Sequence, residues 1–227
     1  ESLDTALLAS RLKTAIWGVG ELSTLACVPR VEDLLTSPYA SVRKQALMTM
    51  TKLQGDRFGD RLVEFLIEPS PAVCKEASRQ CLKSNMTFTA DKLIGVCSLS
   101  LYKHSVATSV GLSKSINKWE GLLFLLRLVG LVDKSEFIDI SMIDYEMGEW
   151  NVGFNKSSSQ PTASQIEALL NAYAESRSRL SLQRQRSLVF TFKTCGFRDV
   201  GFESISITTK WWTTSKSGNC CIFELKS

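Results

Sequence analysis

Apolar residues recur at helical spacing along most of the chain, and the pattern repeats every 31 residues. A shift by this length superposes six identical pairs: Arg30 on Arg61, Leu35 on Leu66, Pro38 on Pro69, Val42 on Val73, Lys44 on Lys75 and Ala46 on Ala77. One step earlier, Ala15 aligns with Ala46, so the repeats are expected to enter the chain in mid-unit. Because a lone unit of this size cannot bury its apolar side, the repetition predicts a stack of neighbouring units.

Each repeat unit predicts two helices. The first is short, residues 28–36 and 58–67, and is followed by Pro38 or Pro69, through which a helix does not easily continue. The second helix has one apolar side, formed by residues spaced four, four and three apart: Val42, Ala46, Met50 and Leu53. The repeated alanine is small at a place where two helices are expected to approach closely.

The turn between the two helices carries a recognisable run, Ser37-Pro38-Tyr39-Ala40-Ser41-Val42-Arg43-Lys44-Gln45-Ala46. It resembles the "D-P-x-x-x-V-R-x-x-A" turn and helix start of the HEAT-repeat family, in its short bacterial form also seen in phycobilisome lyases. Residues 15–20 resemble that family's "A-x-x-A-L-G-x-L-G" segment, and the second copy departs from the pattern at Cys74, where Arg is usual. The resemblance covers residues 12–84 and implies an α-solenoid of helix pairs, but little about function.

The repetition weakens beyond Phe88. Leu93, Val96 and Cys97 fit another first helix, and residues 106–116 fit a degenerate second helix. Residues 119–132 are apolar on nearly all sides and predict a central, buried helix. A further helical stripe follows, formed by Phe137, Ile140, Ile143, Met147 and Trp150.

A polar, Ser-rich loop is expected at residues 151–161, and Thr162 with Gln165 predicts a capping box at the next helix start. That helix has a buried side formed by Ile166, Leu169, Leu170 and Tyr173. This part of the chain is similar to C-terminal parts of large bacterial HEAT-repeat proteins. Beyond it, strand-forming residues at 203–209 and 220–225 predict a β-hairpin.

The expected fold is therefore mainly α, an α-solenoid of HEAT-like helix pairs with a small C-terminal β-hairpin. Its expected domains are a repeat array at 1–117, a helical module at 118–200 that continues the stack, and a hairpin cap at 201–227. The chain begins with Glu1 rather than Met. It is therefore expected to be a fragment of a larger, multidomain bacterial protein.

Composition agrees with a folded globular protein, with 44% hydrophobic and 22% charged residues. The longest apolar run, residues 122–132, contains Arg127 and is shorter than the roughly 20 residues of a membrane span, so no membrane partner is expected. The seven cysteines are odd in number and form no C-x-x-C pair. They predict reduced structural thiols in the cytoplasm rather than a disulfide framework or a zinc site.

Residues suited to catalysis are few. His104 is the only histidine and has no catalytic motif around it, so a surface or capping role is expected. The sequence contains no Gly-rich phosphate loop, H-E-x-x-H or EF-hand pattern. Helical spacing places an acidic cluster on a solvated side: Asp139, Asp144, Glu146 and Glu149. No catalytic residue, metal site or cofactor is predicted.

The net charge of +4 is uneven, because residues 175–227 contain nine Lys or Arg against four acids. This segment holds the candidate partner-binding residues: Arg177, Arg179, Arg184, Arg186, Lys210, Trp211 and Trp212. Cations interleaved with tryptophan suit contacts with phosphates and bases. If residues 175–186 form one helix, however, Arg177 and Arg184 lie nearly opposite the other two arginines, so the four do not form one phosphate track.

The expected function is non-catalytic recognition or scaffolding of another protein, or of another domain of the same chain. The alternative is nucleic-acid binding through the basic C-terminal segment, since a HEAT-like fold is also known for alkylpurine DNA glycosylases. A third interpretation, a bilin lyase, rests on the repeat resemblance alone.

Overall fold

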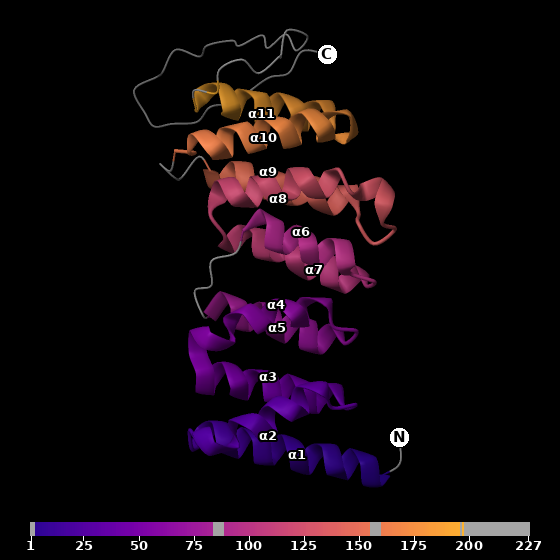
Figure 1. Cartoon of the computed structure of the whole chain (residues 1–227). Helices are drawn as coiled ribbons and strands as arrows, with labels where there is room; N and C mark the ends of the chain where they lie inside the picture. Colours follow the sequence, from indigo (N-terminus) through magenta and orange to yellow (C-terminus); the bar gives the residue numbers. More distant parts are fainter. Residues whose placement is uncertain (1–2, 84–88, 155–159, 196, 198–227) are drawn as a thin grey trace, which may run out of the picture.

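The computed structural model describes residues 3–83, 89–154, 160–195 and 197, which are mainly helical. In chain order the helices are α1 (Leu3–Glu21), α2 (Val28–Asp33), α3 (Ala40–Gln54), α4 (Gly59–Glu64), α5 (Pro71–Lys83), α6 (Ala90–Leu99), α7 (Lys103–Leu112), α8 (Lys118–Val129), α9 (Ile140–Phe154), α10 (Ala163–Ser176) and α11 (Leu182–Thr194). They stack along one axis, with α1 at one end and α11 at the other (Figure 1).

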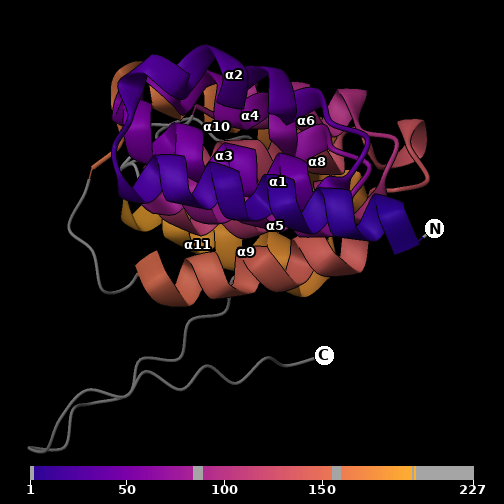
Figure 2. The same ribbon diagram turned by 90° about the horizontal axis from the view of Figure 1, so that it is seen from below.

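The helices alternate between two layers (Figure 2). In the odd layer α1, α3, α5, α7, α9 and α11 pack in succession, each against the next. The even layer contains α2, α4, α6, α8 and α10, and consecutive helices such as α2 and α3 or α4 and α5 pack across the two layers. Each helix therefore buries its apolar side only against near neighbours in the chain, as expected for repeated units.

The repeat positions lie where the sequence predicts. Val42, Ala46 and Met50 are fully buried on α3, and Val73 and Ala77 are fully buried on α5. Each first helix is an α-helical turn and a half that tightens into a 3-10 turn, at Leu34–Thr36 after α2 and at Phe65–Ile67 after α4. The paired architecture of residues 28–83 is thus confirmed.

Helix α8 is the centre of the second half, and nine of its twelve residues are buried. It packs against α6, α9 and α10, so it continues the even layer without a break. Gly121 allows α8 to approach the 3-10 turn at Ser113–Ser115, because a Cβ there would lie 2.7 Å from the Ser113 carbonyl oxygen. The predicted capping box at Thr162 and Gln165 is also confirmed at the start of α10.

Some predicted boundaries were wrong. Helix α9 continues to Phe154, so the loop expected at 151–161 is helical over its first four residues. Helix α7 begins at Lys103, three residues earlier than predicted. Its N-cap is Tyr102, which has extended backbone. The hairpin expected at 201–227 lies outside the described residues.

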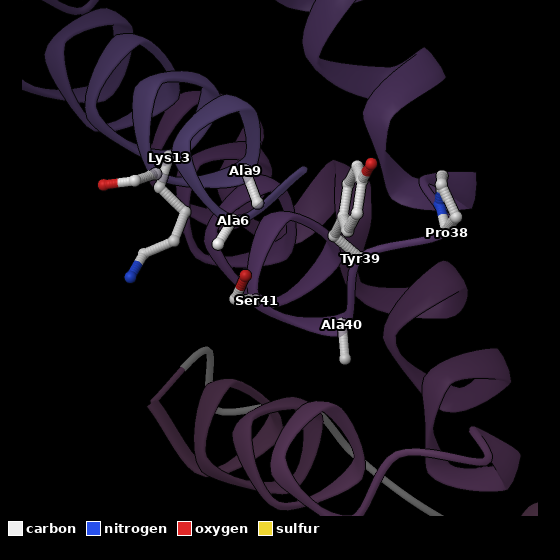
Figure 3. A pocket seen from close by; sticks show the side chains of 8 residues that line it. Ala6, Ala9, Lys13, Pro38, Tyr39, Ala40 and Ser41 are labelled. Atoms are coloured by element: carbon white, nitrogen blue, oxygen red, sulfur yellow. The ribbon is translucent and has the colours of Figure 1, made fainter. Parts of the chain in front are cut away.

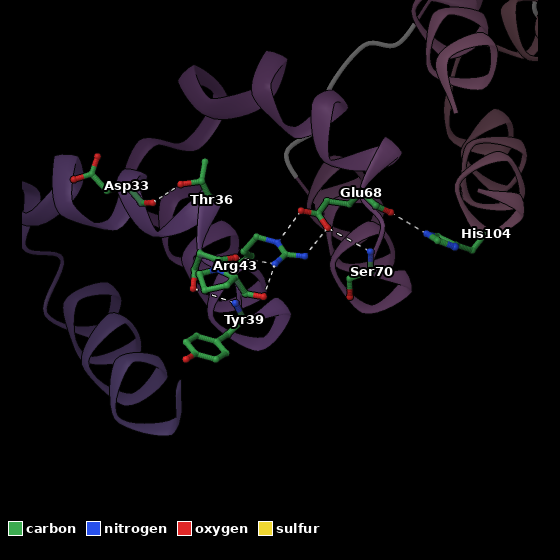
Figure 4. Close-up of polar contacts among 9 residues, drawn as sticks. Asp33, Thr36, Tyr39, Arg43, Glu68, Ser70 and His104 are labelled. Atoms are coloured by element: carbon green, nitrogen blue, oxygen red, sulfur yellow. Dashed lines mark hydrogen bonds and ion pairs between the residues drawn. The ribbon is translucent and has the colours of Figure 1, made fainter. Parts of the chain in front are cut away.

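A chain of polar contacts links three repeats at their turns (Figure 4). The Nε and Nη2 groups of Arg43 donate to the two carboxylate oxygens of Glu68 at 2.8 and 2.9 Å. Its Nη1 group donates to the carbonyls of Ser37 and Pro38 at 2.8 and 3.2 Å. The carbonyl of Glu68 lies 2.9 Å from Nε2 of His104 and accepts its hydrogen bond. One arginine therefore caps its own turn and holds the next repeat.

The departure from the repeat pattern at Cys74 has a local explanation. The carbonyl of Leu66 accepts hydrogen bonds from the Cys74 thiol, at 3.3 Å, and from the Ser105 hydroxyl. His104 of α7 donates to the Glu68 carbonyl, and this replaces the hydrogen bond that Arg43 donates to the equivalent Ser37 carbonyl in the first copy. The turn carbonyls are satisfied in both repeats, although the donors differ.

We expect Ala46→Asp to lower the free energy of unfolding by more than about 3 kcal/mol, because it places an unpaired charge at a fully buried position between packed helices. Ala15→Asp is the matched control, since Ala15 occupies the equivalent repeat position but is exposed. Thermal melts of both variants test this. Equal melting temperatures for the two variants would contradict the register.

We expect Arg43→Lys to cost about 1–3 kcal/mol, because a lysine keeps the charge but loses the planar fork that reaches both a carboxylate and two carbonyls. Arg61→Lys serves as the control, since Arg61 makes one half-exposed ion pair, with Glu32. Chemical denaturation measures both. A loss for Arg61→Lys as large as that for Arg43→Lys would show that the turn contacts contribute nothing special.

Candidate interaction surfaces

The solvent side of the odd layer carries cations at repeated positions. Lys13, Lys44 and Lys75 are 31 residues apart, on α1, α3 and α5, and Lys52 and Lys83 form a second row on α3 and α5. All five are exposed except Lys44, whose side chain is 39% exposed. With Arg79, which lies between the rows, we call these residues the basic face: Lys13, Lys44, Lys52, Lys75, Arg79 and Lys83.

Charge is divided unequally between the two layers. Helices α3, α5 and α7 contain seven Lys or Arg and a single acid, Glu76, whereas α2, α4 and α6 contain three Lys or Arg and five acids. The first three helices therefore have a net charge of +6 and the other three a net charge of −2, and the two groups are on different sides of the stack. A surface of one sign attracts partners of the opposite sign.

In the even layer, cations pair with acids on the preceding helix. Arg61 of α4 pairs with Glu32 of α2, and Lys92 of α6 pairs with Asp60 of α4 at 2.8 Å. Arg127 of α8 continues this ladder to α6 through Asp91. Each of these exposed ion pairs contributes little stability, but together they neutralise three cations of the even layer with acids of the same layer.

The basic face has far less internal compensation. Lys13, Lys75 and Lys83 form no ion pair with any described residue. Lys52 has one exposed pair, with Glu21 at 3.1 Å. Glu76 is 2% exposed and lies beneath the surface. This buried carboxylate accepts from Arg79 and Gln80 at 2.8 and 2.7 Å and lies 3.8 Å from the ammonium of Lys44.

The outer side of α1 is apolar and exposed. Leu8 and Ala15 of α1 and Leu22, one residue beyond its end, are spaced seven residues apart and so lie along one side of the helix; Leu8 and Leu22 are 50% and 80% exposed. Leu3 and Leu7 are also exposed, but they lie about 140° and 100° around the helix from Leu8 and are not part of this stripe. Ala46 and Ala77, the repeat equivalents of Ala15, are fully buried on helices that pack against α2 and α4. We call this surface the α1 patch.

A shallow groove of about 490 Å³ lies between α1 and the start of α3 (Figure 3). Most residues that line it are small, and one aromatic side chain, Tyr39, joins them: Ala6, Ala9, Ser10, Pro38, Tyr39, Ala40 and Ser41. Lys13 lies at its border and connects it to the basic face. The groove lining contains no acid and no histidine among its described residues, so its chemistry suits contact rather than proton transfer.

The predicted C-terminal cations are not one surface. Two of them form ion pairs with two hydrogen bonds each. Arg179 donates twice to one oxygen of Asp133, at 2.6 and 2.9 Å, and Arg184 donates to both oxygens of Asp144, at 3.0 and 3.2 Å. Arg177 is exposed, and Arg186 is half-buried. Residues 175–186 are not one helix. Arg177 and Arg179 are in a 3-10 turn, and Arg184 and Arg186 are in α11, which begins after its N-cap Ser181. Lys210, Trp211 and Trp212 lie outside the described residues.

The other candidate chemical groups have structural partners. His104 caps the Glu68 carbonyl and stacks on Tyr102 at 5.4 Å, which is the capping role expected for it. The acidic cluster is less solvated than expected, because Asp144 pairs with Arg184 and Glu146 with Lys114 of the neighbouring repeat. Within the described part of the chain, no three His, Cys, Asp or Glu side chains are placed to hold a metal ion.

Sequence reasoning missed the basic face although its signal was present. The superposition that identified the repeats already aligned Lys44 with Lys75, and the same shift aligns Lys13 with Lys44 and Lys52 with Lys83. A net charge counted over residues 1–174 hid these rows, because acids elsewhere in this range, on both layers and in the turns, offset them. Charge must be counted by repeat position, not by segment, to find such a surface.

No protein-family model, curated protein or solved structure matches the chain. In the described residues, every helix is too short or too polar to cross a membrane. The function must therefore be inferred from the surfaces themselves.

We expect Cys81 and Cys97 to resist iodoacetamide in the folded protein at pH 8. Burial raises the pKa of both thiols to about 12, so only about one molecule in ten thousand carries the reactive thiolate. Cys27, which is half-exposed, is the internal control. Peptide mapping by mass spectrometry separates the sites. Labelling of Cys81 or Cys97 as fast as Cys27 would show that the packing around these buried thiols opens readily.

Proposed function

We propose that this chain is an α-solenoid of HEAT-like repeats that recognises a protein partner, or another domain of its own chain, and catalyses no reaction. The two-layer stack, the 31-residue repetition and the turn motif support the solenoid assignment. The observation that carries the recognition function is the α1 patch.

The α1 patch is unusual for a surface. Of the twelve large apolar side chains that are exposed in the described residues, six lie within residues 3–25. Scattered apolar side chains are normal on protein surfaces, but a contiguous group of this kind marks an interaction site. Leu8, Ala15 and Leu22 form a straight stripe of the width that one helix covers.

The occupant that fits is an amphipathic helix packed as α2 packs on α3 and as α4 packs on α5. In those pairs the repeat alanine is closed off completely, whereas Ala15 is exposed. The small side chain at position 15 leaves room for close approach of a backbone. The flanking Leu8 and Leu22 supply apolar area on both sides of it. A helix of a partner protein or of a neighbouring domain would extend the stack by this geometry.

A non-catalytic role in the cytoplasm is part of the proposal. The buried thiols of Cys74, Cys81 and Cys97 pack as small apolar side chains, and the five described cysteines are free, which fits a reducing compartment. The imidazole of His104 is engaged with a backbone carbonyl. Both observations support structural rather than chemical roles for these groups.

The test begins with a photo-crosslinking amino acid, p-benzoylphenylalanine, in place of Leu22 in the native cell. Any crosslinked protein is then purified and titrated against the wild-type chain and the Leu8→Glu/Leu22→Glu variant. We expect binding of the variant to be at least about 100-fold weaker, because two leucines lose about 3 kcal/mol of burial. The variant itself should fold normally, since both side chains are exposed in the free chain.

The matched control is Leu99→Glu/Leu101→Glu, which alters two leucines that are 70% and 69% exposed, at the last residue of α6 and in the turn that follows it. This variant should bind the purified partner as the wild type does. Equal loss in both variants would mean that the α1 patch is not the docking site. Unchanged binding of the Leu8→Glu/Leu22→Glu variant would have the same meaning.

A further inference from the structure

We propose that the basic face binds the phosphodiester backbone of a nucleic-acid duplex, without reading its sequence. This activity uses a different surface from the α1 patch and does not depend on the function proposed above. It also differs from the alternative suggested by sequence, which placed nucleic-acid binding in the C-terminal segment.

The first argument is electrostatic. Six cations gather on α1, α3 and α5. Among the acids of these helices, Glu76 is buried beneath Lys44 and Arg79, and Glu21 pairs with Lys52. Like charges close together repel one another, and binding of an anionic ligand lowers this repulsion energy. The even layer shows that this stack can pair its cations with acids from helix to helix. On the basic face, Lys13, Lys75 and Lys83 have no such pair.

The second argument is geometric. Lys44 and Lys52 are eight residues apart on α3, and Lys75 and Lys83 are eight apart on α5, so the two rows are separated by about 12 Å along the helices. Adjacent helices in a layer lie about 8–10 Å apart, which sets the spacing within each row. The major groove of B-form DNA is about 12 Å wide between its two strands. One row can therefore follow each strand, with Arg79 between them.

The third argument concerns the kind of side chain. Five of the six cations are lysines, whose ammonium groups are mobile point charges on flexible stems rather than planar forks for one bidentate partner. Such groups suit a regular row of phosphates and carry no information about bases. The groove beside Lys13 is wide open to solvent, so it does not enclose a flipped base. The expected binding is electrostatic and independent of sequence.

The experiment measures fluorescence anisotropy of a labelled 30-base-pair duplex of arbitrary sequence with the full chain, at salt concentrations from 0.05 to 0.2 M. Neutralisation of six phosphates predicts a slope of about −5 for log affinity against log salt. The variant Lys13→Glu/Lys75→Glu/Lys83→Glu removes exposed cations that have no described ion pair. We expect it to bind at least about tenfold more weakly and to lower the slope by about 3.

The matched control reverses three exposed cations outside the basic face, Arg30→Glu/Arg57→Glu/Lys134→Glu. Both variants change the net charge by the same amount, so only location distinguishes them. The control should bind the duplex nearly as the wild type does. Equal loss in both variants would show general attraction to a positive protein and would overturn the proposal.

Two competitors decide the class of ligand. A single strand of the same length lacks the second row of phosphates and should bind at least about fivefold more weakly; equal binding would overturn the duplex assignment. Poly-glutamate should compete poorly. If it binds as tightly as the duplex, the surface takes acidic proteins and the nucleic-acid proposal fails. The Leu8→Glu/Leu22→Glu variant should retain duplex binding, so failure here and failure of the α1 patch proposal remain distinguishable.

Discussion

The structure depends on one constraint, which is that no helix pair of this chain can bury its apolar side alone. Val42 and Ala46 are fully buried on α3, and the next unit, 31 residues on, buries Val73 and Ala77 in the same register. The repeated alanine is small at a place where neighbouring helices approach closely. A charge in this seam would have no partner, so the register is strongly selected.

The same register has a consequence for the surface. When core residues repeat every 31 positions, any surface residue that repeats with them forms a straight row across the layer. The lysines at 13, 44 and 75 become a row for this reason, and so do those at 52 and 83. In a stack of repeated helices, charged surface residues that recur at the repeat spacing therefore form a linear array, and no other structural feature is needed. This coupling between core and surface is what makes the basic face regular enough to follow a polymer.

The sequence predicted the part of the fold where local pattern and packing agree. Paired helices at 28–83, the buried residues of α3 and the capping box at Thr162 all follow from helical periodicity and short-range capping chemistry. Helix ends were less predictable, because the N-cap of α7 at Tyr102 has no capping side chain to mark it.

The ion pairs could not be predicted from the sequence, since Arg184 meets Asp144 across 40 positions through the packing of α9 and α11. That contact removes Arg184 from the predicted basic site.

The two proposed surfaces are on nearly opposite sides of α1. Lys13 and Ala15 are two residues apart, which separates them by about 200° around the helix. A helix docked on Ala15 would therefore leave Lys13 and the basic face uncovered. If the docked helix belongs to a further repeat of the same kind, its partner helix would lie beside α1 in the odd layer and could extend the rows of the basic face. Partner recognition and duplex binding would then reinforce each other, because each added repeat lengthens the charged track.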